Sequence, residues 1–199
     1  TNLRETIKMS IELQSLKSSL EQEINGIKEQ EDLQKKLDQV RAKIYELDDK
    51  NFANKLEDIK AKVTKIFQDL NFEFSSRSLP ENAEEHTFSY SSFVLKFIFP
   101  NPSQGFFGCR SVIEVHVSQG SKKQEYSMRI LEKREQSLNT EKLPLPERIE
   151  ALEKYLSSYT AKNYDLSTVN EASRQHSLLA TDLDQFTDHI DVIVKNFKK

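Results

Sequence analysis

The first third of the chain has the composition and spacing of long helices. Residues 3–70 contain no proline and a single glycine, the two residues that helix interiors exclude. Apolar residues recur there at steps of three and four, which places them on one face of a helix. The remaining positions are mostly Glu, Lys, Gln, Asp and Ser, so the apolar strip is narrow and needs a cover. We therefore predict that residues 1–70 form a long amphipathic helical region.

The alternation of three- and four-residue steps is typical of the a and d positions of a coiled coil. The positions that we expect to form an oligomerisation seam are Leu16, Leu20, Ile24, Ile27, Leu33, Leu37, Val40, Ile44, Leu47, Leu56, Ile59, Val63 and Ile66. The spacing is interrupted between Ile27 and Leu33, and it slips by two residues between Leu47 and Phe52. Two arrangements fit these breaks: an interrupted coiled coil with a partner helix, or separate helices that fold back on each other. A partner helix is the simpler way to bury the apolar strip.

From residue 72 the apolar period changes from that of a helix to the period of two that is typical of strands. We predict a short strand beginning at Asn71, a strand over residues 87–99, and further strands over residues 110–117 and 125–131. In the segment 87–99 the apolar phase switches at Ser91, which indicates a bulge or bend. One face of these strands is apolar, and the other carries Lys96, Glu114, His116 and Arg129. The pattern favours an antiparallel meander of about four strands with one wet face.

Two helices are predicted after the strands. The first opens at Glu147, behind Pro146, because proline is favoured at the start of a helix. The second follows the segment 165–167, with an apolar stripe at Val169, Ala172, His176, Leu179, Leu183, Phe186, Ile190, Ile193 and Phe197. The predicted fold class is α+β, with long N-terminal coiled-coil helices and a small antiparallel meander packed on the C-terminal helices. The predicted division is a coiled-coil or helical oligomerisation region at 1–70 and a globular head at 71–199.

The segment PNPSQGFFGCR, residues 100–110, holds two of the five prolines, two of the four glycines and the single cysteine. It connects the two best-defined strands, which indicates a hairpin tip. Phosphate-binding loops need small residues where backbone amides approach an anion, whereas Phe106 and Phe107 stand between the two glycines. Two aromatic residues on a loop are typical of a protein contact, so we predict Phe106 and Phe107 as a contact for a partner.

The sequence offers no convincing chemistry. The four histidines show no HxxxH spacing, and Cys109 has no second cysteine at metal-ligand distance. Asp184, Asp188 and Asp191 are the best candidates for a cation or acid–base site, because they share one face of the predicted last helix. That face points away from the buried side, which indicates solvated surface. We predict no catalytic residue, no cofactor and no metal site.

Charge and hydropathy exclude several classes of partner. The net charge of −3 is spread almost evenly along the chain, so no segment has the basic excess that phosphate backbones attract. Direct binding of nucleic acid is therefore disfavoured. No apolar run approaches the ~18 residues of a membrane span, which argues against a membrane partner. A single cysteine excludes a disulfide within the chain. We expect a soluble, intracellular chain.

The order of the predicted elements, a long helix, a meander and two helices, resembles the layout of the coiled-coil-plus-RWD subunits of kinetochore complexes. The tyrosine–proline motif of many RWD domains is absent, and the segment LPLP at residues 143–146 does not match it. The resemblance is one of layout and implies no family membership. We expect a non-enzymatic assembly subunit that self-associates or pairs with another coiled-coil chain and docks a partner with its head. The alternatives are an accessory domain of a larger coiled-coil ATPase or nuclease assembly and, third, an enzyme that uses the acidic helix face.

Overall fold

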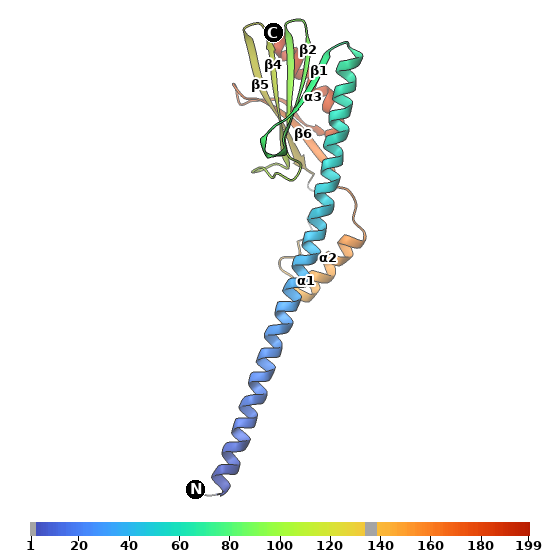
Figure 1. Cartoon of the computed structure of the whole chain (residues 1–199). Coiled ribbons are helices and arrows are strands. Elements are labelled where there is room, and N and C mark those ends of the chain that lie inside the picture. Colours follow the sequence, from blue (N-terminus) through green and yellow to red (C-terminus); the bar gives the residue numbers. More distant parts are fainter. Residues whose placement is uncertain (1–2, 134–138) are drawn as a thin grey trace. The chain divides into compact units, whose positions relative to one another are not determined.

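The computed structural model describes residues 3–133 and 139–199, and it is a mixed structure of helices and strands (Figure 1). The chain divides into two compact units. The first unit consists of Thr1–Glu46 and Leu138–Tyr159, and the second of Leu47–Ser137 and Thr160–Lys199. The predicted α+β class is confirmed in this broad form.

Helix α1, Leu3–Asp69, is a single continuous helix of 67 residues (Figure 1). The interruptions in the apolar spacing therefore do not break it. The buried positions of the helix continue across the phase slip, because Asp48 rather than Leu47 is the buried residue between Ile44 and Phe52. The slip is a change of which residue faces inward, and the backbone continues through it.

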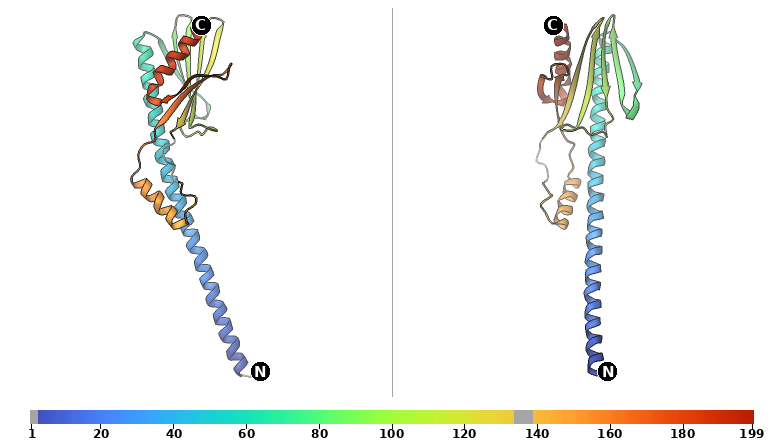
Figure 2. Two further views of the ribbon diagram at one scale, coloured as in Figure 1. Left: turned by 180° about the vertical axis from the view of Figure 1, so that it is seen from behind. Right: turned by 90° about the vertical axis from the view of Figure 1, so that its left-hand side faces the viewer.

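In the first unit, helix α2, Leu145–Ser157, lies beside the middle of α1 (Figures 1 and 2). Pro146 stands in its first turn, as predicted from the preference of proline for this position. An ion pair of 2.9 Å joins Lys36 of α1 to Glu153 of α2. Among the described residues of this unit, the buried apolar ones are Leu37, Val40, Ile44 and Ile149.

In the part of the chain that the structure describes, the second unit contains one antiparallel sheet of seven strands in the order β1-β2-β3-β4-β5-β6-β7. The prediction of about four strands is therefore too low. The strands are β1 (Glu73–Ser78), β2 (Glu84–Tyr90), β3 (Phe93–Phe99), β4 (Ser111–Gln119), β5 (Lys122–Glu132), β6 (Tyr164–Asn170) and β7 (His176–Asp182). Each strand pairs with its neighbour in the sequence, so the sheet is a simple meander with α2 inserted between β5 and β6.

One extra strand arises where we predicted a bulge. The apolar phase switches at Ser91 because the chain reverses there, and β2 and β3 pair antiparallel with Tyr90 opposite Phe93. Ser91 adopts a positive φ of 54°, a conformation that tight turns require and that non-glycine residues adopt less readily. The apolar residues of both strands then face the same side.

The other two extra strands replace the first half of the predicted last helix, which is wrong for residues 169–182. β6 is buried on both faces, so it lacks the alternation that identifies a strand. The turn after it contains neither glycine nor proline. The Asn170 side chain accepts hydrogen bonds from the amides of Ala172 and Ser173, and Arg174 takes a φ of 53°. Only α3, Phe186–Lys198, remains of that helix, preceded by the 3-10 turn Leu183–Gln185.

One face of the sheet carries the hydrophobic core of the second unit. The C-terminal half of α1 and helix α3 lie against this face (Figures 1 and 2). α1 contributes Phe52, Leu56, Ile59, Val63 and Phe67; α3 contributes Phe186, Ile190, Ile193 and Phe197. The opposite face of the sheet carries the alternate, mostly polar residues, and the candidate site lies there.

Candidate functional site

The face of the sheet away from α1 and α3, called the open face below, is set by the alternation of side chains along each strand. In β3, Leu95 and Phe97 are buried against the helices, so Lys96 between them lies on the open face. The strand register then brings polar residues into one row, with Thr87 opposite Lys96, Lys96 opposite His116, and His116 opposite Glu125. This confirms the predicted wet face and its residues Lys96, Glu114, His116 and Arg129.

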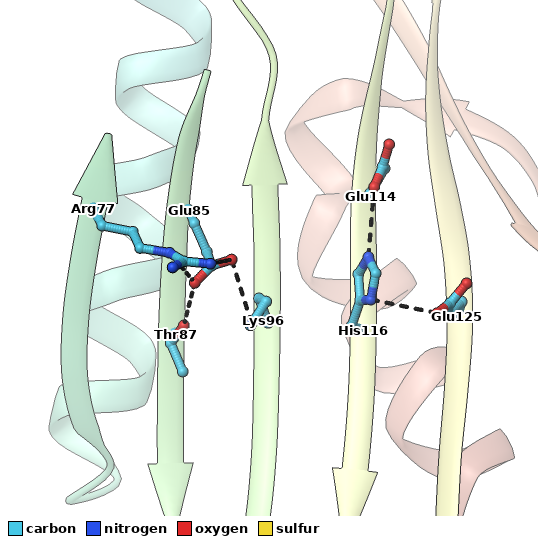
Figure 3. A network of polar contacts seen from close by, with 7 residues as sticks. All are labelled: Arg77, Glu85, Thr87, Lys96, Glu114, His116 and Glu125. Atoms are coloured by element: carbon cyan, nitrogen blue, oxygen red, sulfur yellow. Dashed lines mark hydrogen bonds and ion pairs between the residues drawn. The ribbon is translucent and has the colours of Figure 1, made fainter. Parts of the chain in front are cut away.

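Glu85 is the centre of a charged network at the β1 side of the open face (Figure 3). Arg77 donates two hydrogen bonds to its carboxylate, at 2.9 and 3.0 Å. The Nζ of Lys96 lies 3.3 Å from the same carboxylate, and the Thr87 hydroxyl donates a long contact of 3.5 Å. The paired arginine lowers the pKa of Glu85, with a smaller contribution from Lys96. Glu85 is therefore an ionised acceptor whose lone pairs are occupied, which suits a structural role more than acid–base chemistry.

His116 lies between two carboxylates further along the same row (Figure 3). Its Nε2 is 3.5 Å from Glu114, and its Nδ1 is 3.6 Å from Glu125. Both distances exceed those of good hydrogen bonds, and all three side chains reach solvent. The described residues around them include no serine or cysteine nucleophile within hydrogen-bond distance of the imidazole. The arrangement is a solvated charge cluster.

A concavity of about 700 Å³ opens on this face beneath the β3–β4 loop. Its apolar lining comes from Ile98, Val112 and Leu131, whose side chains stand on the open face between the polar ones. Glu114, Arg129, Ser127 and Ser167 add charged and hydroxyl groups. The loop itself contributes both predicted contact residues, Phe106 and Phe107. The hollow therefore mixes apolar side chains with several charged and polar ones, which also include Glu81 and His176.

The β3–β4 loop is a hairpin tip, as predicted, because β3 and β4 pair antiparallel on either side of it. Phe106 pairs with Cys109 in an isolated bridge, and Gly108 between them has a φ of +77°, which glycine adopts without strain. Phe107 is fully exposed at the turn. Partial burial raises the pKa of the Cys109 thiol, which makes it a poor nucleophile.

The three aspartates predicted to share a helix face belong to two elements. Asp184 lies in the 3-10 turn Leu183–Gln185, whereas Asp188 and Asp191 lie in α3. All three are exposed, and Asp191 pairs with Lys195 one turn along. Within residues 3–133 and 139–199, no group of three or more His, Cys, Asp or Glu side chains is arranged to hold a metal ion.

The structure reveals a buried histidine that sequence reasoning missed. His189 of α3 is fully buried, and its two ring nitrogens lie 2.8 Å from the Thr168 hydroxyl and 2.7 Å from the Thr181 hydroxyl. Burial lowers its pKa. Thr168 and Thr181 come from β6 and β7, which sequence periodicity assigned to a helix, so no sequence signal placed these partners together. His189 thereby ties α3 to the two strands at this edge of the sheet.

The predicted seam residues fall into two groups. In the second unit Leu56, Ile59 and Val63 are buried in the core, and Ile66 and Leu47 are half-buried. In the first unit Leu37, Val40 and Ile44 are buried and Leu33 is half-buried. The exposed group of predicted seam residues is Leu16, Leu20, Ile24 and Ile27. The same strip continues toward the N-terminus with Met9 and Leu13, which were not among the predicted seam residues, and each of the six is between 48% and 59% accessible. Among the described side chains of the seam, this N-terminal group is the part left exposed, because the remaining seam residues are buried or half-buried within the chain.

Comparison with known proteins adds no assignment: no family model, curated protein or solved structure matches the chain significantly. Among the described residues, none of the helices has a stretch long and apolar enough to cross a membrane.

Proposed function

We propose that this chain is a non-enzymatic assembly subunit that associates through the N-terminal part of α1 and docks a protein partner with the open face of its second unit. The exposed apolar group Met9–Ile27 carries the proposal. Its six large side chains follow consecutive turns of a 67-residue helix, each about half accessible to water. Folded chains rarely leave a contiguous apolar strip exposed unless something binds it.

The second contact is supported by the β3–β4 loop. Phe107 projects fully into solvent beside a hollow with an apolar lining. An exposed aromatic residue next to such a hollow has the features of an interface anchor, because aromatic side chains dominate binding energy at protein contacts. Phe106, half-buried beneath it, supports the turn.

The chemistry of the described residues supports a binding role. The Cys109 thiol has a raised pKa, His189 is enclosed between two threonine hydroxyls, and the Glu85 carboxylate is engaged by two cations. None of these groups combines a free nucleophile with a nearby base, as covalent catalysis requires.

The association is tested by a single substitution on the strip and a matched substitution off it. Leu20→Glu places a charge on the strip, whereas Ile11→Glu places one on the opposite side of the same helix segment at similar exposure, 61% against 48%. We expect the wild-type chain to self-associate in sedimentation equilibrium or to retain a stoichiometric partner when purified from its source. Leu20→Glu should abolish this association and Ile11→Glu should preserve it. The proposal would be contradicted by a wild-type chain that stays monomeric and that retains no partner which Leu20→Glu releases.

The docking contact is tested with Phe107→Ala. Because the ring is fully exposed, its removal should leave the melting temperature unchanged while a partner retained by the second unit is lost. Tyr45→Ala is the matched control, since Tyr45 is an exposed aromatic residue (65%) on α1 in the first unit. Equal retention of the partner by both variants would exclude the loop as the contact.

A further inference from the structure

We infer that residues 9–28 of α1 pair in parallel, and in register, with the same segment of a second copy of this chain. The inference rests on the proposed function, because it names the partner of the exposed strip that the proposed function leaves open. Three features of the segment carry it: a repeat, a defined end and a separation of charge.

The segment consists of two copies of an 11-residue repeat, MSIELQSLKSS at residues 9–19 and LEQEINGIKEQ at residues 20–30. The apolar strip occupies equivalent positions of the two copies, as the pairs Met9/Leu20, Leu13/Ile24 and Leu16/Ile27. Eleven residues cover three turns at about 3.67 residues per turn, close to the 3.6 of a straight helix. The strip therefore runs almost parallel to the helix axis, over about 27 Å from residue 9 to residue 27. A second helix can lie along it with little supercoiling.

The strip also has a defined end. The next positions of the repeat are Glu31, Lys35 and Asp38, all of them polar. From Leu37 onward the predicted seam residues of α1 are buried or half-buried within the chain. Among the side chains that the structure describes, the exposed part of the strip therefore lies within residues 9–28, and one partner helix can cover it.

Charges of opposite sign flank the strip on opposite sides. With 100° between successive residues, Glu12 and Glu23 lie on one flank and Lys17 and Lys28 on the other, with Glu21 slightly further round on the lysine side. Both sets repeat at the same 11-residue interval as the strip. The only ion pair in this stretch of the described chain is between Lys17 and Glu21, at 3.7 Å and with both side chains more than 60% exposed. Such a solvated pair contributes little, so Lys17 can exchange it for a contact with a partner.

This separation selects the orientation and the identity of the partner. When two identical helices pair in parallel, opposite flanks meet, so the acidic flank of each copy faces the basic flank of the other. Glu12 then faces Lys17 of the second copy, and Glu23 faces Lys28, each five residues further along the partner, as in the flanking ion pairs of parallel coiled coils. In an antiparallel pair, like flanks meet and the acidic residues face each other. The apolar strip supplies the affinity, and the charges decide the orientation.

Self-association is measured on the full chain by sedimentation equilibrium across a wide concentration range. We expect a reversible monomer–dimer equilibrium that Leu20→Glu shifts entirely to monomer and that the off-strip variant Ile11→Glu does not shift. Circular dichroism of each variant separates loss of pairing from loss of folding, since the helix beyond residue 37 packs within the chain.

Orientation is measured by disulfide trapping in a Cys109→Ser background, where each variant carries one new cysteine. Leu13→Cys lies near one end of the strip and should cross-link to itself in a parallel, in-register pair, because only then do the two side chains approach within disulfide distance. In an antiparallel pair, a mixture of Leu13→Cys and Ile24→Cys chains should instead give the mixed disulfide. Ile11→Cys, off the strip, should give no cross-link in either case.

A charge-swapped variant tests the role of the flanks. It carries Glu12→Lys, Glu23→Lys, Lys17→Glu and Lys28→Glu, which exchanges the two flanks and preserves the net charge. In a parallel pair, swapped chains and wild-type chains should each pair with themselves and avoid one another, because a mixed pair brings like charges together. In an antiparallel pair the mixed dimer should dominate. Mixing tagged and untagged chains distinguishes the two results.

The outcomes separate this inference from the proposed function. A dimer that cross-links through Leu13→Cys and self-sorts supports both. A mixed dimer of swapped and wild-type chains, or a Leu13–Ile24 cross-link, overturns the parallel pairing and leaves assembly through the strip intact. A wild-type chain that is monomeric at all concentrations overturns self-pairing. If that chain also retains no strip-dependent partner, the proposed function falls with it.

Discussion

The guanidinium carbon of Arg110 lies 4.2 Å from the centre of the Phe52 ring. Its Nη2 also donates a 2.7 Å hydrogen bond to Asp49, and the side chain is only 11% exposed. Arg110 follows the β3–β4 loop, and Phe52 is a fully buried residue of α1. Within the second unit, this contact ties the base of the loop that carries Phe106 and Phe107 to the helix that covers the core.

We predict that Arg110→Ala lowers the free energy of unfolding by about 1–3 kcal/mol, because it removes a desolvated cation–π contact and a charged hydrogen bond together. Arg110→Lys should fall between the wild type and the alanine variant, since lysine keeps the charge but cannot stack a planar group on the ring. Urea denaturation measures both. Arg129→Ala is the control, because Arg129 is an exposed arginine of the neighbouring strand. Equal losses for Arg110→Ala and Arg129→Ala would contradict the role of the stacking.

The buried imidazole of His189 predicts a dependence of stability on pH. Burial lowers the pKa of His189 in the folded chain, so the unfolded chain, with a histidine pKa near 6.5, binds the proton first as pH falls. Stability is therefore fully present above pH ~6.5 and decreases below it, by at most about 1.4 kcal/mol per pH unit for one proton. Asp188 opposes this shift only in part.

The measurement is the free energy of unfolding between pH 5 and 8 for the wild type and for His189→Gln, which does not titrate. We expect a shallower slope in the variant over this window. His176→Gln is the matched control, because it removes an exposed histidine from the start of β7. An unchanged slope in His189→Gln would show that the imidazole is not the titrating group.

The position of the core predicts where the chain can be cut. A fragment of residues 47–199 keeps every residue of the core cluster of the second unit, so it should melt cooperatively. A fragment of residues 71–199 lacks Phe52, Leu56, Ile59, Val63 and Phe67, and it should not. Loss of each large buried apolar side chain lowers the free energy of unfolding by about 2–5 kcal/mol. The summed loss for five such side chains exceeds the total stability of an ordinary domain. A cooperative melt of 71–199 near the temperature of 47–199 would show that α1 is dispensable to the head.

The exposed aspartates near the C-terminus should contribute little to the melting temperature. Replacing Asp184, Asp188 and Asp191 with Asn should change the melting temperature little, because exposed ion pairs contribute about 0–1 kcal/mol each. Addition of Mg²⁺ or Ca²⁺ should not raise the melting temperature of the wild type. A metal-dependent rise that the triple variant abolishes would identify a cation site on this surface.

Local sequence signals predicted the elements that have a regular apolar period or are marked by proline and glycine. The helical character of residues 3–69, the strands over 110–117 and 125–131, helix α2 and the hairpin tip were all foreseeable from periodicity and from proline and glycine positions. Residues 164–182 were not, because a strand buried on both faces loses its alternation and a turn closed by the Asn170 side chain carries no glycine or proline. The His189 site depends on that hairpin, so it was missed with it.

The apolar strip along α1 separates what the sequence determines from what the tertiary structure decides. By itself the sequence determines that one face of the helix must be covered from Met9 to Phe67, because apolar side chains at helical spacing need shelter from water. The sequence does not determine what packs against this face, since Leu16 and Leu56 occur in the same local pattern of apolar residues. Tertiary structure decides it: Leu56 is fully buried beneath the sheet, and Leu16 remains 56% exposed. The difference arises from residues far away in the chain, whose approach no local period encodes.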